Sequence, residues 1–313
     1  MDLVPDTAIS EVDGQRNRIV VRGRDLAGLA GRISYEEMCA LLWQREAPAL
    51  GEARIRAARA LPLDANLRSA LASLAGDDPV FLTATVAVAA ARQGRNVEPD
   101  PSLGHVADFL RMATGSVDPA RAAALETYFV AMAENGLNTS TYVARIVAST
   151  GASAPSAILA AFCALEGPLH GGAPGDVLDM LHAVGPASGA VDWVGAERAA
   201  GRRIPGLGHR IFTGGDPRAS ILEVASASLP SARLLPVARA VKEAANLRRE
   251  TPLFANVELF TAVLLDAVGL PKSLFTPTFA AARVAGWCAH IAEQRATGKL
   301  IQPNARYTGP PSL

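Results

Sequence analysis

Long apolar stretches built from Ala, Leu and Val are the feature that most constrains the fold of this chain. Apolar residues make up 50% of the 313 residues, whereas only 5% are aromatic. Alanine has the highest helix propensity, and its small side chain lets helices pack closely. The two-residue alternation that is typical of strands is scarce. The sequence therefore predicts an all-α protein, long enough for one or two domains.

Capping residues, glycines and prolines along the sequence mark where helices are expected to begin and end. The first 25 residues are the exception, because residues 8–15 and 19–23 flank Asp13-Gly14 and predict a short β-hairpin. Ser34 and Glu37 form a capping-box pattern for a helix that stops before Pro48. We expect Asp176 and Asp216 to be N-caps of two later helices, which end near 184 and 228. The other expected helices lie at 51–61, 64–75, 79–93, 103–114, 119–135, 142–149, 154–164, 191–200, 231–249, 256–268 and 273–295.

Charge and cysteine usage exclude several classes of protein. Thirty basic residues balance thirty acidic ones, which argues against a nucleic acid or a membrane surface as partner. No run of 18 apolar residues predicts a membrane span, and the acidic N-terminus has no signal-peptide pattern. The three cysteines, Cys39, Cys163 and Cys288, are far apart and favour neither a disulfide framework nor a metal site. We therefore expect a cytoplasmic protein.

One histidine lies in a Gly/Pro-rich segment between two apolar helices. Residues 167–175 read GPLHGGAPG, with His170 at the centre. Glycine has no Cβ, so a ligand can approach the chain closely at this point. A histidine in a helix connection can equally be a structural hydrogen-bonding residue. Its role therefore depends on which other groups face it.

Two arginines are unusual for a helical bundle. Arg218 lies in the first turn of its helix, where the helix dipole disfavours a cation, so an anion or a carboxylate is expected beside it. Arg283 lies in an apolar helix and is the only permanently charged residue between Phe275 and Ile291. A buried guanidinium needs a carboxylate partner. A solvated surface position for Arg218 and a structural salt bridge for Arg283 are the alternatives.

His170, His209 and Glu258 are the candidate acids and bases. Glu258 is flanked by apolar residues at a helix start, where a carboxylate also favours the positive end of the helix. A zinc site formed by these three residues is conceivable, although no two of them have the short spacing of metal ligands, and we expect no metal. We expect His105, His182 and His290 to be structural or surface residues.

Ordered motifs along nearly the whole chain resemble the citrate synthase family, which includes 2-methylcitrate synthases. The motifs are Thr7–Gly14, Gly167–Ala173, Gly206–Arg210 with Asp216–Ala219, Asn256–Glu258, Phe275–Trp287 and Tyr307–Gly309. The resemblance implies a helical homodimer with a large domain, residues 1–172 and 273–313, and a smaller inserted domain, residues 173–272. The chain looks shortened around residues 61–80.

The resemblance also implies a reaction. An acyltransferase of this family joins acetyl-CoA, or a related acyl-CoA, to a 2-oxo acid such as oxaloacetate, and gives citrate or an alkylcitrate plus CoA. The CoA thioester is a substrate, and no cofactor is bound permanently. Small molecules are the expected partners. The implied catalytic residues are His170, His209 and Glu258; Arg218, Arg283, Asn135, Gln302, Asn138 and Ser140 would bind the substrate; Arg203, Pro205, Gly206, Leu207 and Gly208 would receive CoA.

Three positions depart from the family pattern. Glu258 stands where the family base is usually Asp, Asn135 where a substrate-binding histidine is usual, and Gln302 where an arginine reaches into the partner subunit's site. An acyltransferase with a retuned pocket is the favoured interpretation. The alternatives are a catalytically degenerate paralogue that binds a CoA thioester or a carboxylate, and a citryl-CoA-type lyase.

Overall fold

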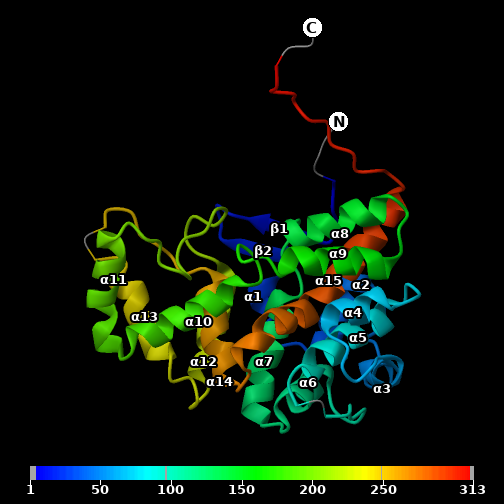
Figure 1. Cartoon of the computed structure of the whole chain (residues 1–313), viewed down its shortest axis with the longest axis horizontal. Coiled ribbons are helices and arrows are strands. Elements are labelled where there is room, and N and C mark those ends of the chain that lie inside the picture. The colour runs from blue at the N-terminus through cyan, green and yellow to red at the C-terminus, as the bar shows by residue number, and fades with distance from the viewer. Residues whose placement is uncertain (1–4, 96, 248, 311–313) are drawn as a thin grey trace.

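The protein is almost entirely helical (Figure 1). The computed structural model describes residues 5–95, 97–247 and 249–310. The elements in chain order are β1 (Ser10–Asp13), β2 (Arg18–Val21), β3 (Arg24–Asp25), α1 (Leu26–Leu29), α2 (Tyr35–Trp43), α3 (Leu50–Ala60), α4 (Leu67–Ala72), α5 (Pro79–Arg92), α6 (His105–Thr114), α7 (Pro119–Met132), α8 (Thr139–Ser149), α9 (Ala154–Leu165), α10 (Ala173–Val184), η1 (Ala187–Gly189), α11 (Ala190–Ala199), α12 (Pro217–Ala227), α13 (Leu235–Ala244), α14 (Val257–Ala267), η2 (Lys272–Leu274) and α15 (Phe275–Thr297).

Helix α15 is the centre of the architecture. It packs against α2, α5, α7, α8 and α9, and every residue from Pro277 to Ile291 is buried. Its alanines and Gly286 let neighbouring backbones approach closely. The helices α10 to α14, which the sequence analysis assigns to an inserted domain, lie together at one end of the molecule (Figure 1). The division into two domains stays a prediction.

The N-terminal hairpin braces a loop that is distant in sequence. β1 and β2 pair antiparallel with Ser10 opposite Val21, as the sequence predicts. The hairpin turn then contacts residues 213–214: Thr213 N–H donates to Gly14 O at 3.1 Å, and Gly214 N–H donates to Asn17 Oδ1 at 2.7 Å. The hairpin therefore supports the loop that follows His209.

Most predicted helix starts are confirmed. Ser34 and Glu37 form a complete capping box, and Asp216 accepts a hydrogen bond from the backbone N–H of Arg218 as an N-cap. The expected cap at Asp176 is wrong, because α10 already begins at Ala173 and Asp176 lies in its first turn. A carboxylate favours the positive helix end at either position, so the residue type alone does not decide between them.

Other boundaries differ from the expected ones. Helix α8 begins earlier, at Thr139, because Asn138 supplies a side-chain cap. Helix α13 is shorter than the expected 231–249, and the short helix α1 was not predicted. The cysteines Cys39, Cys163 and Cys288 are all free. Among the described residues, no helix has both the length and the apolar character to span a bilayer.

Gly286 offers a test of how closely α15 packs against the chain after α7. A Cβ at this position would lie 2.2 Å from Ala133 O and 2.7 Å from Glu134 Oε2. We expect Gly286→Ala to lower the free energy of unfolding by about 1–3 kcal/mol through overpacking. Gly195→Ala in α11 is the matched control, because its Cβ would meet nothing within 4 Å and should stabilise the helix by about 0.5–1 kcal/mol. Urea unfolding of both variants measures the difference, and equal effects would contradict the close packing.

Candidate active site

A short backbone pairing fastens the loop before His209 to the chain before Glu258. We call residues 206–208 with residues 254–256 the latch. Gly206 and Gly208 have positive φ angles of 81° and 83°, which favour glycine, and a Cβ on Gly206 would lie 3.0 Å from Leu259 Cβ. The contacts of the latch are Asn256 N–H to Gly206 O at 3.0 Å, Gly208 N–H to Phe254 O at 2.8 Å, and an antiparallel bridge between Leu207 and Ala255.

The ring of His209 has a defined tautomer when neutral. Its Nδ1 accepts the backbone N–H groups of Ile211 and Phe212 at 3.0 and 3.1 Å, so the proton of the neutral ring lies on Nε2. Nε2 is 3.7 Å from Asp216 Oδ2. Burial lowers the pKa of His209, although Asp216 opposes this effect. His209 therefore presents an N–H donor at neutral pH.

Arg218 has a carboxylate partner in its own helix cap. Asp216 Oδ1 lies 3.0 Å from Arg218 Nε, and Oδ2 lies 2.6 Å from Nη2, so the pair is bidentate. Both side chains are buried. Burial acts to lower the pKa of Arg218, but the Asp216 carboxylate outweighs this effect and raises it. The carboxylate expected beside Arg218 is thus Asp216, and the alternative of a solvated surface arginine is wrong.

Glu258 is the second residue of α14 and lies next to this ion pair. Burial raises the pKa of its carboxyl group above the usual value, against the lowering effects of its own backbone N–H and of Arg218. A carboxylate with a raised pKa is a stronger base than an exposed one. Glu258 therefore lies at the start of a helix and also has the raised pKa that suits a base.

His170 lies in a tightly wound loop that is tied to α15. Thr276 Oγ1 donates to Gly171 O at 3.0 Å, and the edge of the His170 ring meets Phe279 with the ring centroids 5.9 Å apart. Burial first, and then Arg283 and Arg218, lower the pKa of His170 to about 4. His170 is therefore neutral at physiological pH.

The hydroxyl of Ser140 controls the tautomer of His170. Ser140 Oγ lies 3.0 Å from His170 Nε2 and 2.9 Å from Asn138 Oδ1, and Trp287 Nε1 donates to it at 3.3 Å. A hydroxyl has one proton and can donate it to only one of the two acceptors. When Ser140 donates to His170, the ring proton lies on Nδ1 and is available to a ligand.

Arg283 is a buried cation with free donors. Its Nε donates to Met132 O at 2.5 Å, and its guanidinium carbon lies 5.0 Å from the centroid of the Phe279 ring. Nη1 and Nη2 are buried and have no hydrogen-bond partner among the described residues. The expected salt bridge to Arg283 is wrong, because no described carboxylate lies within ion-pair distance. Burial lowers the pKa of Arg283 to about 10, although the negative charge of Glu134 opposes this effect.

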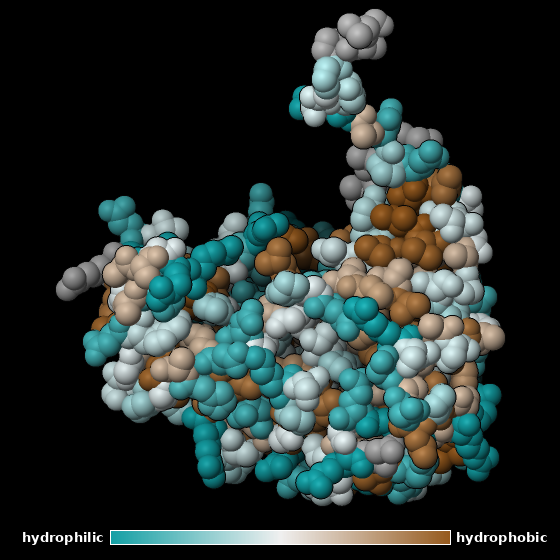
Figure 2. Space-filling view, viewed as in Figure 1, coloured by the Kyte–Doolittle hydropathy of each residue, from teal (hydrophilic) through white to brown (hydrophobic). Residues whose placement is uncertain are grey.

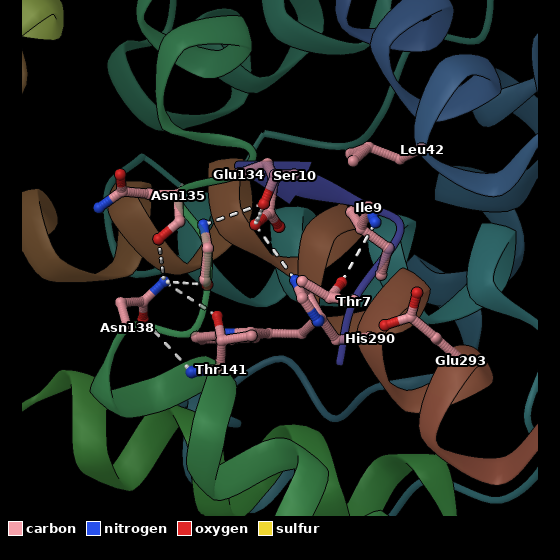
Figure 3. Close-up of polar contacts among 12 residues, drawn as sticks. Thr7, Ile9, Ser10, Leu42, Glu134, Asn135, Asn138, Thr141, His290 and Glu293 are labelled. Atoms are coloured by element: carbon pink, nitrogen blue, oxygen red, sulfur yellow. Dashed lines mark hydrogen bonds and ion pairs between the residues drawn. The ribbon is translucent and has the colours of Figure 1, made fainter. Parts of the chain in front are cut away.

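Glu134 belongs to a chain of polar contacts that includes Ser10 and His290 (Figure 3). Its Oε1 accepts from Ser10 Oγ at 2.7 Å and lies 3.1 Å from His290 Nε2. Arg145 Nη1 lies 3.3 Å from His290 Nδ1, and because arginine only donates, the neutral His290 ring carries its proton on Nε2. Burial would raise the pKa of Glu134, but His290 and Arg283 lower it below the usual value. His290 is therefore buried between Glu134 and Arg145, and its structural role stays a prediction.

The other predicted substrate-binding residues, Asn135, Asn138 and Gln302, lie in three different surroundings. The Asn135 side chain points away from Glu134 and His290 (Figure 3), and its Oδ1 is buried without a partner in the described chain. Asn138 is the N-cap of α8. Gln302 is exposed on the C-terminal tail, which leaves the body of the molecule (Figure 1), so this chain does not bring it to the other residues.

The structure gathers the predicted catalytic residues around Arg218. Its charge acts on His170, His209, Glu258 and Arg283. In the predicted CoA loop, Gly206 and Leu207 are buried in the latch, Pro205 and Gly208 are half-buried, and Arg203 is exposed. The described residues contain no group of three or more His, Cys, Asp or Glu that could hold a metal ion, so the zinc alternative has no support here.

Comparison with known proteins decides the family. Residues 3–85 and 79–304 match the sequence model described as citrate synthase, C-terminal domain. This chain belongs to the citrate synthase family. Citrate synthase of Haloferax volcanii is 33% identical over 364 residues, with 99% of this chain and 95% of the relative covered. The 2-methylcitrate synthase of Mycobacterium tuberculosis is 31% identical over 351 residues, with 98% and 88% covered.

The matches to other family members cover different shares of this chain. A putative citrate synthase 2 of Mycobacterium tuberculosis is 43% identical over 209 residues, which are 65% of this chain and 56% of that relative, so the match spans little more than half of its length. The crystal structure of citrate synthase from Thermotoga maritima has a TM-score of 0.86 at 29% identity, with 99% of this chain and 94% of that one covered. The corresponding values for the Pyrobaculum aerophilum enzyme are 0.83, 27%, 99% and 91%. The predicted fold of the citrate synthase family is confirmed.

The alignment with the Haloferax citrate synthase runs over 364 positions, more than the 313 residues of this chain. The two segments that match the family overlap at residues 79–85, at the beginning of α5. The shortening expected around residues 61–80 stays a prediction.

Sequence reasoning missed several polar residues near the predicted catalytic residues. Asp216 was read only as a cap, although the Asp-Pro-Arg order places an arginine two residues after it, within reach of the same carboxylate. Glu134 had a weaker signal, a lone acid between the apolar end of α7 and Asn135. Tyr128 lies within the apolar face of α7 and gave no signal that separates it from a core residue.

The lowered pKa of His170 predicts a pH-dependent stability. The pKa is about 6.5 in an unfolded chain and about 4 in the fold, so the unfolded state takes up the proton first as the pH falls. Stability is complete above pH 6.5 and is lost as the pH falls toward 4, by about 2 kcal/mol at pH 5. We expect His170→Gln to lose less stability between pH 7 and pH 5 than the wild type by this amount, measured by urea unfolding.

His182→Gln is the matched control, because His182 is exposed on α10. It should keep the pH dependence of the wild type. An equal loss of stability in His170→Gln and the wild type would contradict a neutral, half-buried His170.

Proposed function

We propose that this protein condenses an acyl-CoA with a 2-oxo acid and releases CoA, with acetyl-CoA and oxaloacetate as the reference pair. The observation that carries the proposal is the group formed by two histidines with lowered pKa values, a carboxylate with a raised pKa and two buried guanidinium groups. Membership of the citrate synthase family supports the same reaction. The product is citrate or an alkylcitrate.

Glu258 is the proposed base. The methyl group beside a thioester is a weak acid, and its proton leaves only to a well-placed base whose pKa lies near the working pH. The raised pKa of Glu258 suits this role. The methyl carbon then forms the new bond to the keto carbon of the 2-oxo acid, and water cleaves the thioester to release CoA.

His170 is the proposed donor to the enol oxygen that forms when the proton leaves. This role needs an N–H on Nδ1, so during the reaction Ser140 must donate its proton to His170 Nε2, 3.0 Å away, in place of Asn138 Oδ1, to which it donates at 2.9 Å. A hydrogen-bond donor that is already in position in a water-excluded site stabilises a developing negative charge, because nothing has to reorganise as the charge forms. The pKa of about 4 supports a neutral ring throughout.

His209 is the proposed acid for the second substrate. Its Nε2–H can be donated to the keto oxygen, which becomes an alkoxide as the new bond forms. The two backbone N–H groups on Nδ1 support this tautomer. Arg283 and Arg218 would bind the carboxylates of the 2-oxo acid.

The predicted inserted domain supports a proposed closing motion over the site. Arg218, His209 and Glu258 belong to residues 173–272, whereas His170 and Arg283 belong to the rest of the chain. Closure would exclude water, so that the thioester reacts with the 2-oxo acid before it is hydrolysed. The loop from Arg203 to Gly208 is the proposed CoA contact.

We also propose a homodimer. Apolar side chains gather below the C-terminal tail, over α8 and the end of α15 (Figure 2). Val143, Ile146 and Val147 form a half-buried apolar face of α8. An interface between subunits would cover this face, and the tail with Gln302 extends beyond the body of its own subunit.

The test is the release of CoA from acetyl-CoA with a panel of 2-oxo acids. We expect turnover with at least one acid, and Glu258→Gln should lower kcat by about 10²–10⁴-fold because the base is lost. Glu250→Gln, at an exposed glutamate, is the matched control and should keep full activity.

Failure to release CoA with every acid would overturn the proposed reaction and favour a binding protein. Turnover by Glu258→Gln at the wild-type rate would remove Glu258 from the role of base. Release of acetyl-CoA from a citryl-CoA substrate, without condensation, would favour the lyase alternative.

A further inference from the structure

Tyr128 is a buried tyrosine whose hydroxyl has no partner. It lies on α7, which packs against α12 and α14 on one side and against α15 on the other. Its side chain is fully buried, and its hydroxyl has no hydrogen-bond partner among the described residues. Buried polar groups are almost always hydrogen-bonded, so an exception requires an explanation.

Tyr35 is a buried tyrosine whose hydroxyl is hydrogen-bonded, and it serves as a comparison for Tyr128. Tyr35 is equally buried, but its hydroxyl donates to the backbone oxygens of Ala281 and Ala282, each at 3.0 Å. That bond stabilises the packing of α2 against α15. Tyr128 makes no such bond, so its hydroxyl does not serve the packing of the helices.

Arg283 reaches the helix that carries Tyr128: its Nε donates to Met132 O, one turn after Tyr128 on α7. The charges of Arg283, Arg218 and Glu258 all act on its hydroxyl, and burial keeps the pKa of Tyr128 well above its usual value. The hydroxyl is therefore protonated and is a hydrogen-bond donor. In the same region, Arg283 has two further buried donors, Nη1 and Nη2, without a partner in the described chain.

Three unpartnered donors at one place match the acceptor capacity of a carboxylate. A carboxylate has about four lone-pair sites and can accept a bidentate guanidinium and a hydroxyl together. Asp216 already occupies two donors of Arg218, so Arg283 is the arginine with more free hydrogen-bonding capacity. The unpartnered groups lie on α7 and α15, which pack against each other, and α7 also packs against α12 and α14 of the proposed inserted domain.

We propose that Tyr128 binds the 2-oxo acid, and that its hydroxyl donates to the carboxylate that Arg283 holds. This inference rests on the proposed condensation, because it deepens the same site. Tyr128 is then a substrate-binding residue that acts on the second substrate and makes no contact with the acyl-CoA. Its neutral donor adds affinity for a carboxylate without adding charge to a site that already has two arginines.

The test is Tyr128→Phe, which removes only the hydroxyl. We expect the KM for the 2-oxo acid, assayed with oxaloacetate or with the most active acid of the panel, to rise about tenfold. The KM for acetyl-CoA should change less than twofold. The Tm should stay the same or rise, because an unpartnered buried hydroxyl is removed.

Tyr35→Phe is the matched control. It removes a hydroxyl with two partners, so the Tm should fall while the KM for the 2-oxo acid stays the same. A purely structural Tyr128 would instead behave like Tyr35.

The outcomes separate this inference from the proposed function. Wild-type turnover with an unchanged KM for the 2-oxo acid in Tyr128→Phe overturns the inference alone. A fall in Tm without a change in KM overturns it as well. A wild type that turns over no 2-oxo acid overturns the proposed function, and the inference with it.

Discussion

The unbroken burial of α15 is the constraint on which the site depends. From Pro277 to Ile291 every residue is buried, so the polar groups on this helix need partners inside the protein. Trp287 donates to Ser140, and His290 meets Glu134 and Arg145. Arg283 alone keeps two buried nitrogen atoms without a partner in the described chain. A cation in this position has its greatest effect on an anion that enters from outside, because water does not screen the interaction.

The two arginines of the site differ in their surroundings. Arg218 forms a bidentate pair with Asp216 in the same helix turn, so much of its charge is balanced before any ligand arrives. Arg283 has only a backbone oxygen, an aromatic face and the more distant Glu134. The charge of Arg218 therefore acts on the two histidines and on Glu258. Arg283 has two nitrogen atoms without a partner in the described chain, and these remain open for binding.

The helical fold and most helix starts could be predicted from the sequence, because composition and capping residues act locally. The Ser34 capping box and the Asp216 cap are examples of signals that lie within four residues. The error at Asp176 arose from the same locality, since a carboxylate suits both the cap and the first turn. The family motifs named His170, His209, Glu258, Arg218 and Arg283, and the structure brings all five together.

What the sequence could not predict is the partner of each buried group. The expected carboxylate for Arg283 does not exist within ion-pair distance in the described chain, and Glu134 pairs with His290, which lies 156 residues away. The free hydroxyl of Tyr128 was also invisible, since a buried tyrosine with a partner has the same sequence context. Such pairings depend on how helices that are distant in the chain pack against each other. The periodicity of apolar residues does not predict this packing.

The latch between residues 206–208 and 254–256 makes two distant parts of the chain into one mechanical unit. His209 directly follows one segment of the latch and Glu258 lies two residues after the other, so a displacement of the latch carries both residues together. Their mutual spacing is then insensitive to motion of this end of the molecule, whereas their spacing to His170, which is tied to α15, changes. The geometry among the three groups thus varies only in the two distances to His170, and the backbone around Gly206 and Gly208 sets the third.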